Sequence, residues 1–171
     1  MSAAAADRPL PAFDRFCRWL ATAGGFILLV AAIVTVVSVL GRYFLNAPIP
    51  GDIEIGGFLM AAAIALFLPE CQLRKGNVIV DVFTVAAPVK MQAALDAVAS
   101  LTVAVAAAVI AWRMGIGMVE LRAARDETMV LRLPTWIGFI VVVPSLVLLA
   151  VASLIAAWRD AGIFRRSGAS Q

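Results

Sequence analysis

The stretch WLATAGGFILLVAAIVTVVSVLG, residues 19–41, lies between Arg18 and Arg42 and contains no charged side chain. A helix needs roughly 20 apolar residues to cross the hydrocarbon core of a bilayer. This stretch has that length, and the two arginines stand where the headgroups would begin. It therefore predicts a transmembrane helix.

The whole sequence has the composition of a membrane protein. Of its 171 residues, 63% are hydrophobic and 15% are charged, whereas soluble domains carry about a quarter charged residues. One soluble core of this size cannot bury such an excess of apolar side chains. The net charge of +3 is small and the 14 Lys and Arg residues are scattered. The concentrated basic patch of a nucleic-acid-binding protein is therefore missing, and we expect no nucleic-acid partner.

Functional classes that depend on histidine or on paired cysteines are excluded. The chain has no histidine, which removes bis-His haem ligation, His-containing metal sites and His-dependent acid–base catalysis. Cys17 and Cys71 stand alone, without the CxxC pair of a dithiol redox site. We expect no cofactor, no bound metal and no enzymatic activity.

Three further spans complete the predicted fold, an all-α membrane protein with four transmembrane helices in one integral membrane domain, residues 1–171. Residues 134–158 belong to a second uncharged run, and residues 91–112 contain only Asp96, near the start. Residues 52–74 are long enough to cross the membrane when the charged residues near their two ends lie among the headgroups.

The span at residues 52–74 has features of a helix at both ends. Asp52 is the expected N-cap, and Glu54 in the first turn suits the positive end of the helix dipole. Glu70 lies at the unfavourable end, but Arg74 follows four residues later and is expected to pair with it. The N-cap, the helix dipole and the pair with Arg74 allow these acids to lie at the two headgroup levels.

Small residues recur every four positions in the third span, at Ser100, Ala104 and Ala108. In lipid, this spacing allows two helix backbones to approach closely. An Ala-rich helix without a special interface has the same pattern, so both interpretations remain open.

The ends and the orientation of the spans follow from aromatic and basic residues. All four tryptophans lie at span ends, where indole rings prefer the headgroup region: Trp19, Trp112, Trp136 and Trp158.

Nine Lys and Arg flank one side of the predicted spans: Arg8, Arg15, Arg18, Arg74, Lys75, Lys90, Arg159, Arg165 and Arg166. Five flank the other side: Arg42, Arg113, Arg122, Arg125 and Arg132. The more basic side is the cytoplasmic one, so we expect both tails, residues 1–18 and 159–171, in the cytoplasm.

The first connection contains NAPIPGD, residues 46–52. Pro48 and Pro50 forbid a continuous helix, and Gly51 allows the chain to turn. The stretch is therefore either a tight turn between helices or a shaped surface that a partner contacts.

The other two connections differ in character. The second contains NVIVDVFTV, residues 77–85, which we expect to lie along the cytoplasmic headgroups as a short interfacial segment with Asp81 facing water. The third, residues 113–132, carries mixed charge. It is either a continuation of the third helix past the membrane or a contact surface for a partner on the outer side.

Charged residues are missing from the centres of all four predicted spans. Ion-coupled transporters usually hold ionisable groups or broken helices near the bilayer midplane. Asp96 lies inside a span but close to the cytoplasmic surface, and the acids of residues 52–74 lie near the two ends of that span. Four helices of this kind are expected to support another membrane protein, not to form a substrate pathway alone.

Three stretches together resemble the small permease subunit of tripartite ATP-independent periplasmic (TRAP) transporters. They are RYFLNAPIPGDIEIGGF (residues 42–58), RKGNVIVDVF (residues 74–83) and LRLPTWIGFIVVVP (residues 131–144). The second contains the Gly-x-x-x-x-Asp element of the family at Gly76 and Asp81. The resemblance covers about residues 14–158, and it departs from the family at Asn77, where histidine is common.

The resemblance implies a large membrane subunit that holds the solute and sodium sites, and a periplasmic receptor that delivers a solute, commonly a carboxylate. It implies that the small subunit braces the scaffold of the large one in the bacterial inner membrane. Candidate contact residues are Arg42, Asn46, Asp52, Glu54, Arg74 and Asp81. Two alternatives are a self-sufficient homo-oligomeric four-helix transporter and a haem-free membrane anchor of a respiratory enzyme.

Overall fold

Long apolar helices account for most of the chain. The computed structural model describes residues 11–46, 49–74 and 89–168, with side chains for residues 12–46, 49–74 and 95–158. Its elements are α1 (Pro11–Leu45), α2 (Asp52–Leu73), α4 (Val89–Ala124), the short 3-10 helix η2 (Thr135–Gly138) and α5 (Phe139–Gly168). Four helical segments are long and apolar enough to cross a membrane, which confirms the predicted fold class.

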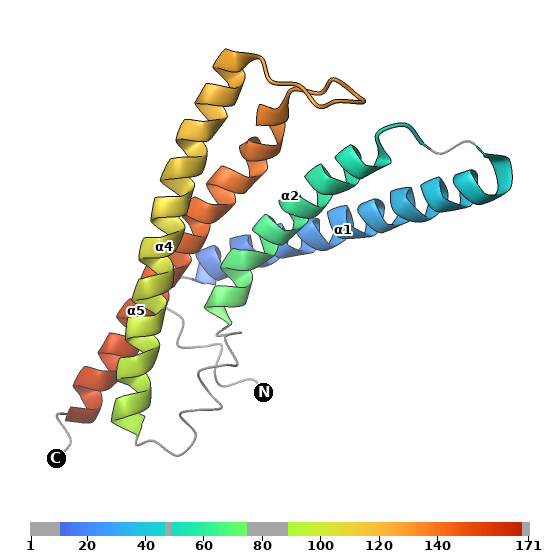
Figure 1. Ribbon diagram of the computed structural model, residues 1–171. Coiled ribbons are helices and arrows are strands. Elements are labelled where there is room, and N and C mark those ends of the chain that lie inside the picture. Colours follow the sequence, from blue (N-terminus) through green and yellow to red (C-terminus); the bar gives the residue numbers. More distant parts are fainter. Residues whose placement is uncertain (1–10, 47–48, 75–88, 169–171) are drawn as a thin grey trace.

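The helices form two antiparallel hairpins, α1–α2 and α4–α5 (Figure 1). Besides packing within each hairpin, α2 packs along α5. The order in space is therefore α1–α2–α5–α4, a single layer with α1 and α4 at its edges, except near the end of α2, where Cys17 of α1 clusters with Leu73 of α2 and Ala152 of α5. Figure 1 shows that the hairpins diverge, so the four helices do not surround a common axis.

Small residues bring α1 close to α2. Four buried positions on α1 follow one another at intervals of seven residues: Cys17, Gly24, Ala31 and Ser38. A Cβ atom added at Gly24 would lie 3.1 Å from the Ala63 carbonyl oxygen and 3.1 Å from Leu66 Cβ. A seven-residue repeat keeps one seam of a helix facing its neighbour over several turns, and small residues along that seam shorten the distance between the two backbones.

The α4–α5 hairpin uses small residues in the same way. The buried positions on α4 are Ser100, Ala104, Ala107 and Ala111, and the last two pack with Leu146 and Leu149 of α5. Of the four-residue repeat that left two interpretations open, Ser100 and Ala104 are buried, but Ala108 is exposed. A strict four-residue repeat rotates around a helix of 3.6 residues per turn, whereas alternating steps of four and three stay on one face.

Helix α4 continues well beyond the predicted end of its span at Trp112. It remains helical to Ala124, which confirms that the third connection starts as a continuation of the helix. The predicted interfacial segment between α2 and α4, including Asp81, lies outside the described residues.

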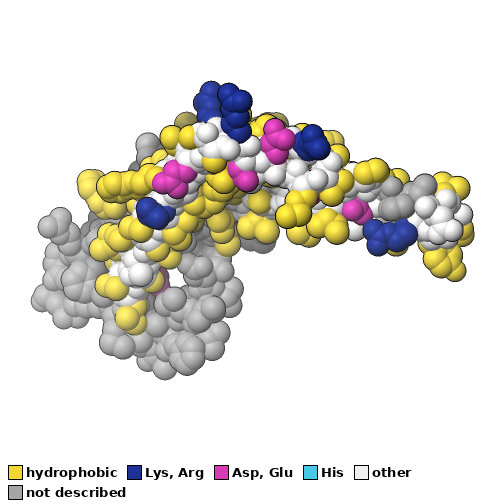
Figure 2. Space-filling view, turned by 45° about the horizontal axis from the view of Figure 1, so that its top comes forward, with side chains coloured by type: hydrophobic (Ala, Val, Ile, Leu, Met, Phe, Trp, Pro, Cys, Tyr) yellow, Lys and Arg dark blue, Asp and Glu magenta, His cyan; other side chains and the backbone are white. Residues whose placement is uncertain are grey.

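Charged side chains gather at the end where α2 begins and α4 turns into α5. Figure 2 shows this end, with basic and acidic side chains along the middle of the described surface and hydrophobic side chains on both flanks. The broad apolar flanks agree with the membrane environment that the sequence predicts.

Candidate functional site

At the start of α2, the α1–α2 hairpin meets the loop of the α4–α5 hairpin. We call this region the α2 junction and define it by Ser38 and Arg42 on α1, Asp52 and Glu54 on α2, and residues 128–133 of the loop between α4 and η2. Three of the six residues predicted to contact a partner lie here: Arg42, Asp52 and Glu54.

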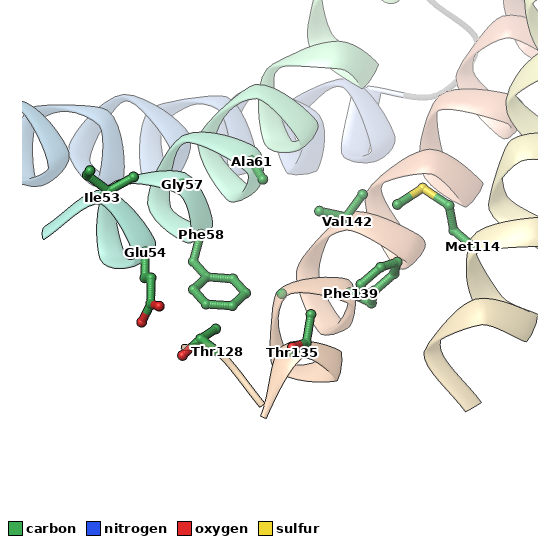
Figure 3. A pocket seen from close by; sticks show the side chains of 11 residues that line it. Ile53, Glu54, Gly57, Phe58, Ala61, Met114, Thr128, Thr135, Phe139 and Val142 are labelled. Carbon is green, nitrogen blue, oxygen red and sulfur yellow. The ribbon is translucent and has the colours of Figure 1, made fainter. Parts of the chain in front are cut away.

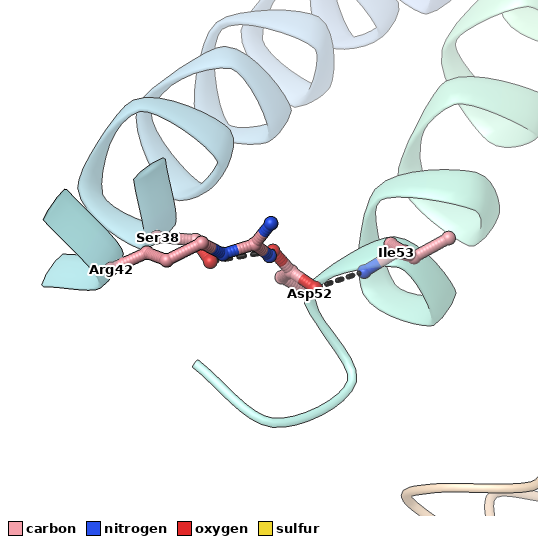
Figure 4. A network of polar contacts seen from close by, with 4 residues as sticks. All are labelled: Ser38, Arg42, Asp52 and Ile53. Carbon is pink, nitrogen blue, oxygen red and sulfur yellow. Dashed lines mark hydrogen bonds and ion pairs between the residues drawn. The ribbon is translucent and has the colours of Figure 1, made fainter. Parts of the chain in front are cut away.

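Asp52 ties α2 to α1 (Figure 4). Its Oδ2 atom accepts a hydrogen bond of 2.5 Å from the Ser38 hydroxyl, and Arg42 Nη2 lies 3.7 Å from the same oxygen. Its Oδ1 atom accepts the Ile53 N–H at 2.8 Å. Ser38 is fully buried, whereas the Arg42 side chain is 62% exposed. The hydroxyl bond is therefore the closer link, and the solvated arginine contributes little.

The prediction that Asp52 caps α2 is wrong. The N-cap is Gly51, which has φ +75°, and Asp52 is the first residue of the helix. Glycine adopts this left-handed conformation without steric strain. The Asp52 carboxylate is instead occupied by Ser38 of α1 and by the neighbouring Ile53 N–H.

Glu54 ties α2 to the loop between α4 and η2. Its Oε1 atom accepts the Val130 N–H at 2.8 Å, and its Oε2 atom accepts the Leu131 N–H at 2.9 Å. Val130 and Leu131 lie in a loop, where no neighbouring helix turn or strand accepts their N–H groups. Each oxygen of the Glu54 carboxylate accepts one of these two donors. Hydrogen bonds to an ionised acceptor are stronger than neutral ones, so the loop is held against the first turn of α2.

The loop is also braced internally. Thr128 donates its N–H to the Leu133 carbonyl at 2.9 Å, and its side-chain oxygen accepts the Leu133 N–H at 3.0 Å. Glu127 and Pro134 form an isolated antiparallel bridge. Arg125 and Arg132, with φ values of 52° and 51°, turn the chain at the two ends of this segment.

Leu131 also packs directly over Gly51. A Cβ atom added at Gly51 would lie 2.5 Å from Leu131 Cγ. Gly51 is therefore required twice, once for its positive φ and once for the close approach of Leu131. The contact adds an apolar component to the hydrogen bonds that Glu54 makes with the same loop.

Below the loop, a groove of about 350 Å³ runs between α2 and the start of α5 (Figure 3). Phe58 forms one wall and approaches Gly138 so closely that an added Cβ would lie 2.7 Å from its ring. The lining is predominantly apolar: Ile53, Glu54, Gly57, Phe58, Ala61, Met114, Thr128, Thr135, Gly138, Phe139 and Val142. Nowhere in the described part of the chain do three His, Cys, Asp or Glu side chains gather to hold a metal ion. The region is built for packing and for holding a loop.

The other predicted contact residues lie elsewhere. Asn46 follows the end of α1, is exposed and has φ 50°. Arg74 lies at the opposite end of α2, where its Nε atom is 2.6 Å from Glu70 Oε1, and this confirms the predicted pairing. Asp81 falls outside the described residues.

Sequence reasoning missed two parts of the junction. Ser38 could have been found, because it is the fourth member of the small-residue repeat on α1. The backbone N–H groups of Val130 and Leu131 left no signal, because any residue except proline supplies the same donor.

The comparisons with known proteins assign the family. The model of the family "Tripartite ATP-independent periplasmic transporters, DctQ component" matches residues 31–162, which is most of the chain. No curated protein and no solved structure is significantly similar to it. A DctQ protein is a component of a transporter, so the prediction that the chain is not an enzyme is confirmed. With four apolar helices and a family match that extends from α1 into α5, the chain belongs to the DctQ family of small TRAP transporter permease subunits.

Proposed function

We propose that this chain braces the large permease subunit of a TRAP transporter in the bacterial inner membrane, with both of its termini in the cytoplasm. The complex takes up a carboxylate-bearing solute, driven by sodium, after a periplasmic receptor has delivered it. In this proposal the chain is a single integral membrane domain and contributes no solute site.

The single layer of helices carries the proposal. A solute pathway needs helices that surround a cavity, and transporter sites are commonly built from interrupted helices at the midplane. Here α1, α2, α5 and α4 lie side by side, and each is continuous over its described length. This arrangement supports a scaffold role over the alternative of a self-sufficient transporter.

The α2 junction gives the layer the stiffness that a brace needs. Asp52 holds α2 to α1, and Glu54 holds α2 to the loop between α4 and η2. Because both acids stand in the first turn of one helix, the two hairpins are fixed to a common point. Glu54 and Asp52 then act within the chain, while the exposed Arg42 and Asn46 remain available to the large subunit or the receptor.

Reconstitution tests the proposal. The receptor is first screened against carboxylates by thermal shift, and the solute that stabilises it is used as the labelled substrate. Liposomes that contain this chain alone should show no uptake, whereas this chain together with the large subunit and the receptor should show uptake that needs an inward sodium gradient. Uptake by this chain alone would contradict the scaffold role, and uptake by the large subunit and receptor without this chain would remove the need for a brace.

A further inference from the structure

Arg113 occupies an unexpected depth on α4. It follows Trp112, the predicted outer end of the span, and would lie among the headgroups if the membrane ended there. The helix continues to Ala124, however. Its packing against α5 and η2 sets where each of its residues lies along the long axis of the molecule.

Three contacts lie at the end of the molecule where α2 begins and α4 turns into α5, and we call their polar groups the polar layer. Asp52 meets Arg42, Glu54 meets Val130 and Leu131, and the Arg122 guanidinium lies 5.2 Å from the centroid of the Trp136 ring. Arg113 precedes Arg122 by nine residues in the same helix. At 1.5 Å per residue it lies about 13 Å below this layer. The centre of a bilayer core is about 15 Å below its edge, so a bilayer whose edge coincides with the polar layer places Arg113 deep in its apolar zone.

The register between α4 and α5 gives the same depth. Ala107 and Ala111 pack with Leu146 and Leu149, and Met114 and Val142 pack against this cluster. Arg113 is therefore level with the residues between Val142 and Leu146. These residues form the middle of the uncharged run from Leu133 to Trp158.

Arg113 cannot easily reach the polar layer by bending its side chain. The Cα–Cβ bonds of a helix tilt toward its N-terminus, and the N-terminus of α4 lies at the end far from Arg122. The stem of Arg113 thus leaves the helix in the direction away from the junction.

None of the side chains that the structure describes supplies a counter-charge to Arg113. Among the residues that the structure describes, its guanidinium has no hydrogen bond, ion pair or ring contact. It is exposed on the surface of an edge helix, with the exposed apolar side chains Val109, Ile110 and Ile116 around it. Gly117, one turn further on the same face, has open space where a side chain would begin. Charged residues inside membranes are normally paired.

We infer that Arg113 forms an ion pair with an Asp or Glu side chain on a transmembrane helix of the large permease subunit. This inference rests on the proposed pairing of the two subunits. A second copy of this chain is a poorer source of the counter-charge, because Glu120, the nearest acid in the sequence, lies seven residues or about 10 Å further along α4, and Asp52 and Glu54 are engaged within the chain. Arg113 and the open position at Gly117 therefore mark the face of α4 that receives the partner helix.

Cysteine labelling tests the depth of Arg113. In a chain without its native cysteines, Arg113→Cys and Asp126→Cys are placed in liposomes and treated with a membrane-impermeant maleimide on both sides. The thiol of the Asp126→Cys variant should react, whereas the thiol of the Arg113→Cys variant should be protected. Equal reaction rates at both positions would place Arg113 in water and overturn the inference.

Co-purification with the large subunit tests the pairing. Arg113→Glu, and the neutral Arg113→Gln, should lower the amount of large subunit recovered by about tenfold or more. The reason is that the acid of the large subunit would be left in the interface without its positively charged partner. Arg125→Glu makes the same change on a solvated residue and should leave recovery unchanged. A photo-crosslinking amino acid at position 113 should capture a membrane helix of the large subunit within one turn of an acid, and reversal of that acid to Arg should restore binding to the Arg113→Glu variant.

The outcomes separate the inference from the proposed function. If the unmodified chain fails to co-purify with the large subunit, the proposed function fails. If the unmodified chain binds but Arg113→Glu binds equally well, or if position 113 crosslinks only to lipid, the ion pair is refuted and the proposed function stands.

Discussion

Glu54 and Leu131 are 77 residues apart in the sequence, yet the Glu54 carboxylate accepts the Leu131 N–H at 2.9 Å. The other carboxylate oxygen accepts the Val130 N–H. Two residues earlier, Asp52 accepts the Ser38 hydroxyl of α1. One turn of α2 therefore connects its own hairpin partner to the loop of the other hairpin, and Glu54 supplies the two hydrogen bonds that hold this loop to α2.

Replacement of Glu54 by glutamine should release the loop. A neutral amide has only one oxygen to accept hydrogen bonds, so at least one of the two N–H groups loses its charged acceptor. We expect the Val130 and Leu131 amides to exchange with solvent deuterium on the order of tenfold faster, as measured by mass spectrometry in detergent. Glu120→Gln removes an exposed charge from α4 and should leave both amides unchanged. Equal protection in the Glu54→Gln variant would show that internal contacts alone hold the loop.

Gly51 should not tolerate alanine. The residue has φ +75°, and an added Cβ would lie 2.5 Å from Leu131 Cγ. Backbone strain of this kind amounts to roughly 1–3 kcal/mol, and the clash adds to it. Gly51→Ala should therefore unfold at a lower temperature and lose protection at Leu131. Gly56→Ala, within α2 and with nothing near its Cβ, should be neutral or slightly stabilising, and a similar loss there would contradict the explanation.

Two adjacent glycines on α1 allow the effect of helix packing on stability to be measured separately from the effect of helix propensity. At Gly24 a Cβ would lie 3.1 Å from two atoms of α2, whereas at Gly25 its nearest neighbour is a Phe67 ring carbon at 3.8 Å. Both changes to alanine raise helix propensity by the same amount. We expect Gly24→Ala to be less stable than Gly25→Ala by about 1–2 kcal/mol in equilibrium unfolding with a denaturing detergent. Equal stabilities would show that α1 and α2 separate at no cost.

The spans could be predicted from sequence because bilayer thickness imposes one length on every helix. Residues 19–41 and 134–158 are uncharged over that length. Near the end of the span at residues 52–74, Glu70 and Arg74 form the ion pair that their four-residue spacing allows. These features depend on residues close together in the chain. Hydropathy and helix geometry are sufficient to find them.

The α2 junction could be predicted only in part. Asp52 and Glu54 stood out as acids at a helix start, but their partners depend on how the two hairpins cross. The end of α4 was ambiguous for a related reason. A tryptophan followed by an arginine, as at Trp112 and Arg113, is typical of a membrane boundary, whereas the structure continues the helix and packs the next residue, Met114, against the cluster that contains Leu146 and Leu149 of α5.

Asp96 should prove dispensable for transport. It lies on α4 near the end opposite the junction and makes interactions within the chain, which suits a structural role near the cytoplasmic headgroups. Asp96→Asn keeps its size and hydrogen-bonding capacity. In liposomes with the large subunit and receptor, this variant should retain most of the sodium-dependent uptake. Complete loss of uptake by a normally assembled complex would indicate that this chain carries a coupling site.

The orientation of the chain can be tested with reporter fusions. Nine Lys and Arg flank one side of the predicted spans and five flank the other, and the more basic side faces the cytoplasm. Alkaline phosphatase, which is active only in the periplasm, should therefore be active when it is fused after Asn46 or Asp126. It should be inactive after Gly76 or at the C-terminus, where a cytoplasmic reporter such as green fluorescent protein should fluoresce. The opposite pattern would reverse the orientation and place the α2 junction on the cytoplasmic side, out of reach of a periplasmic receptor.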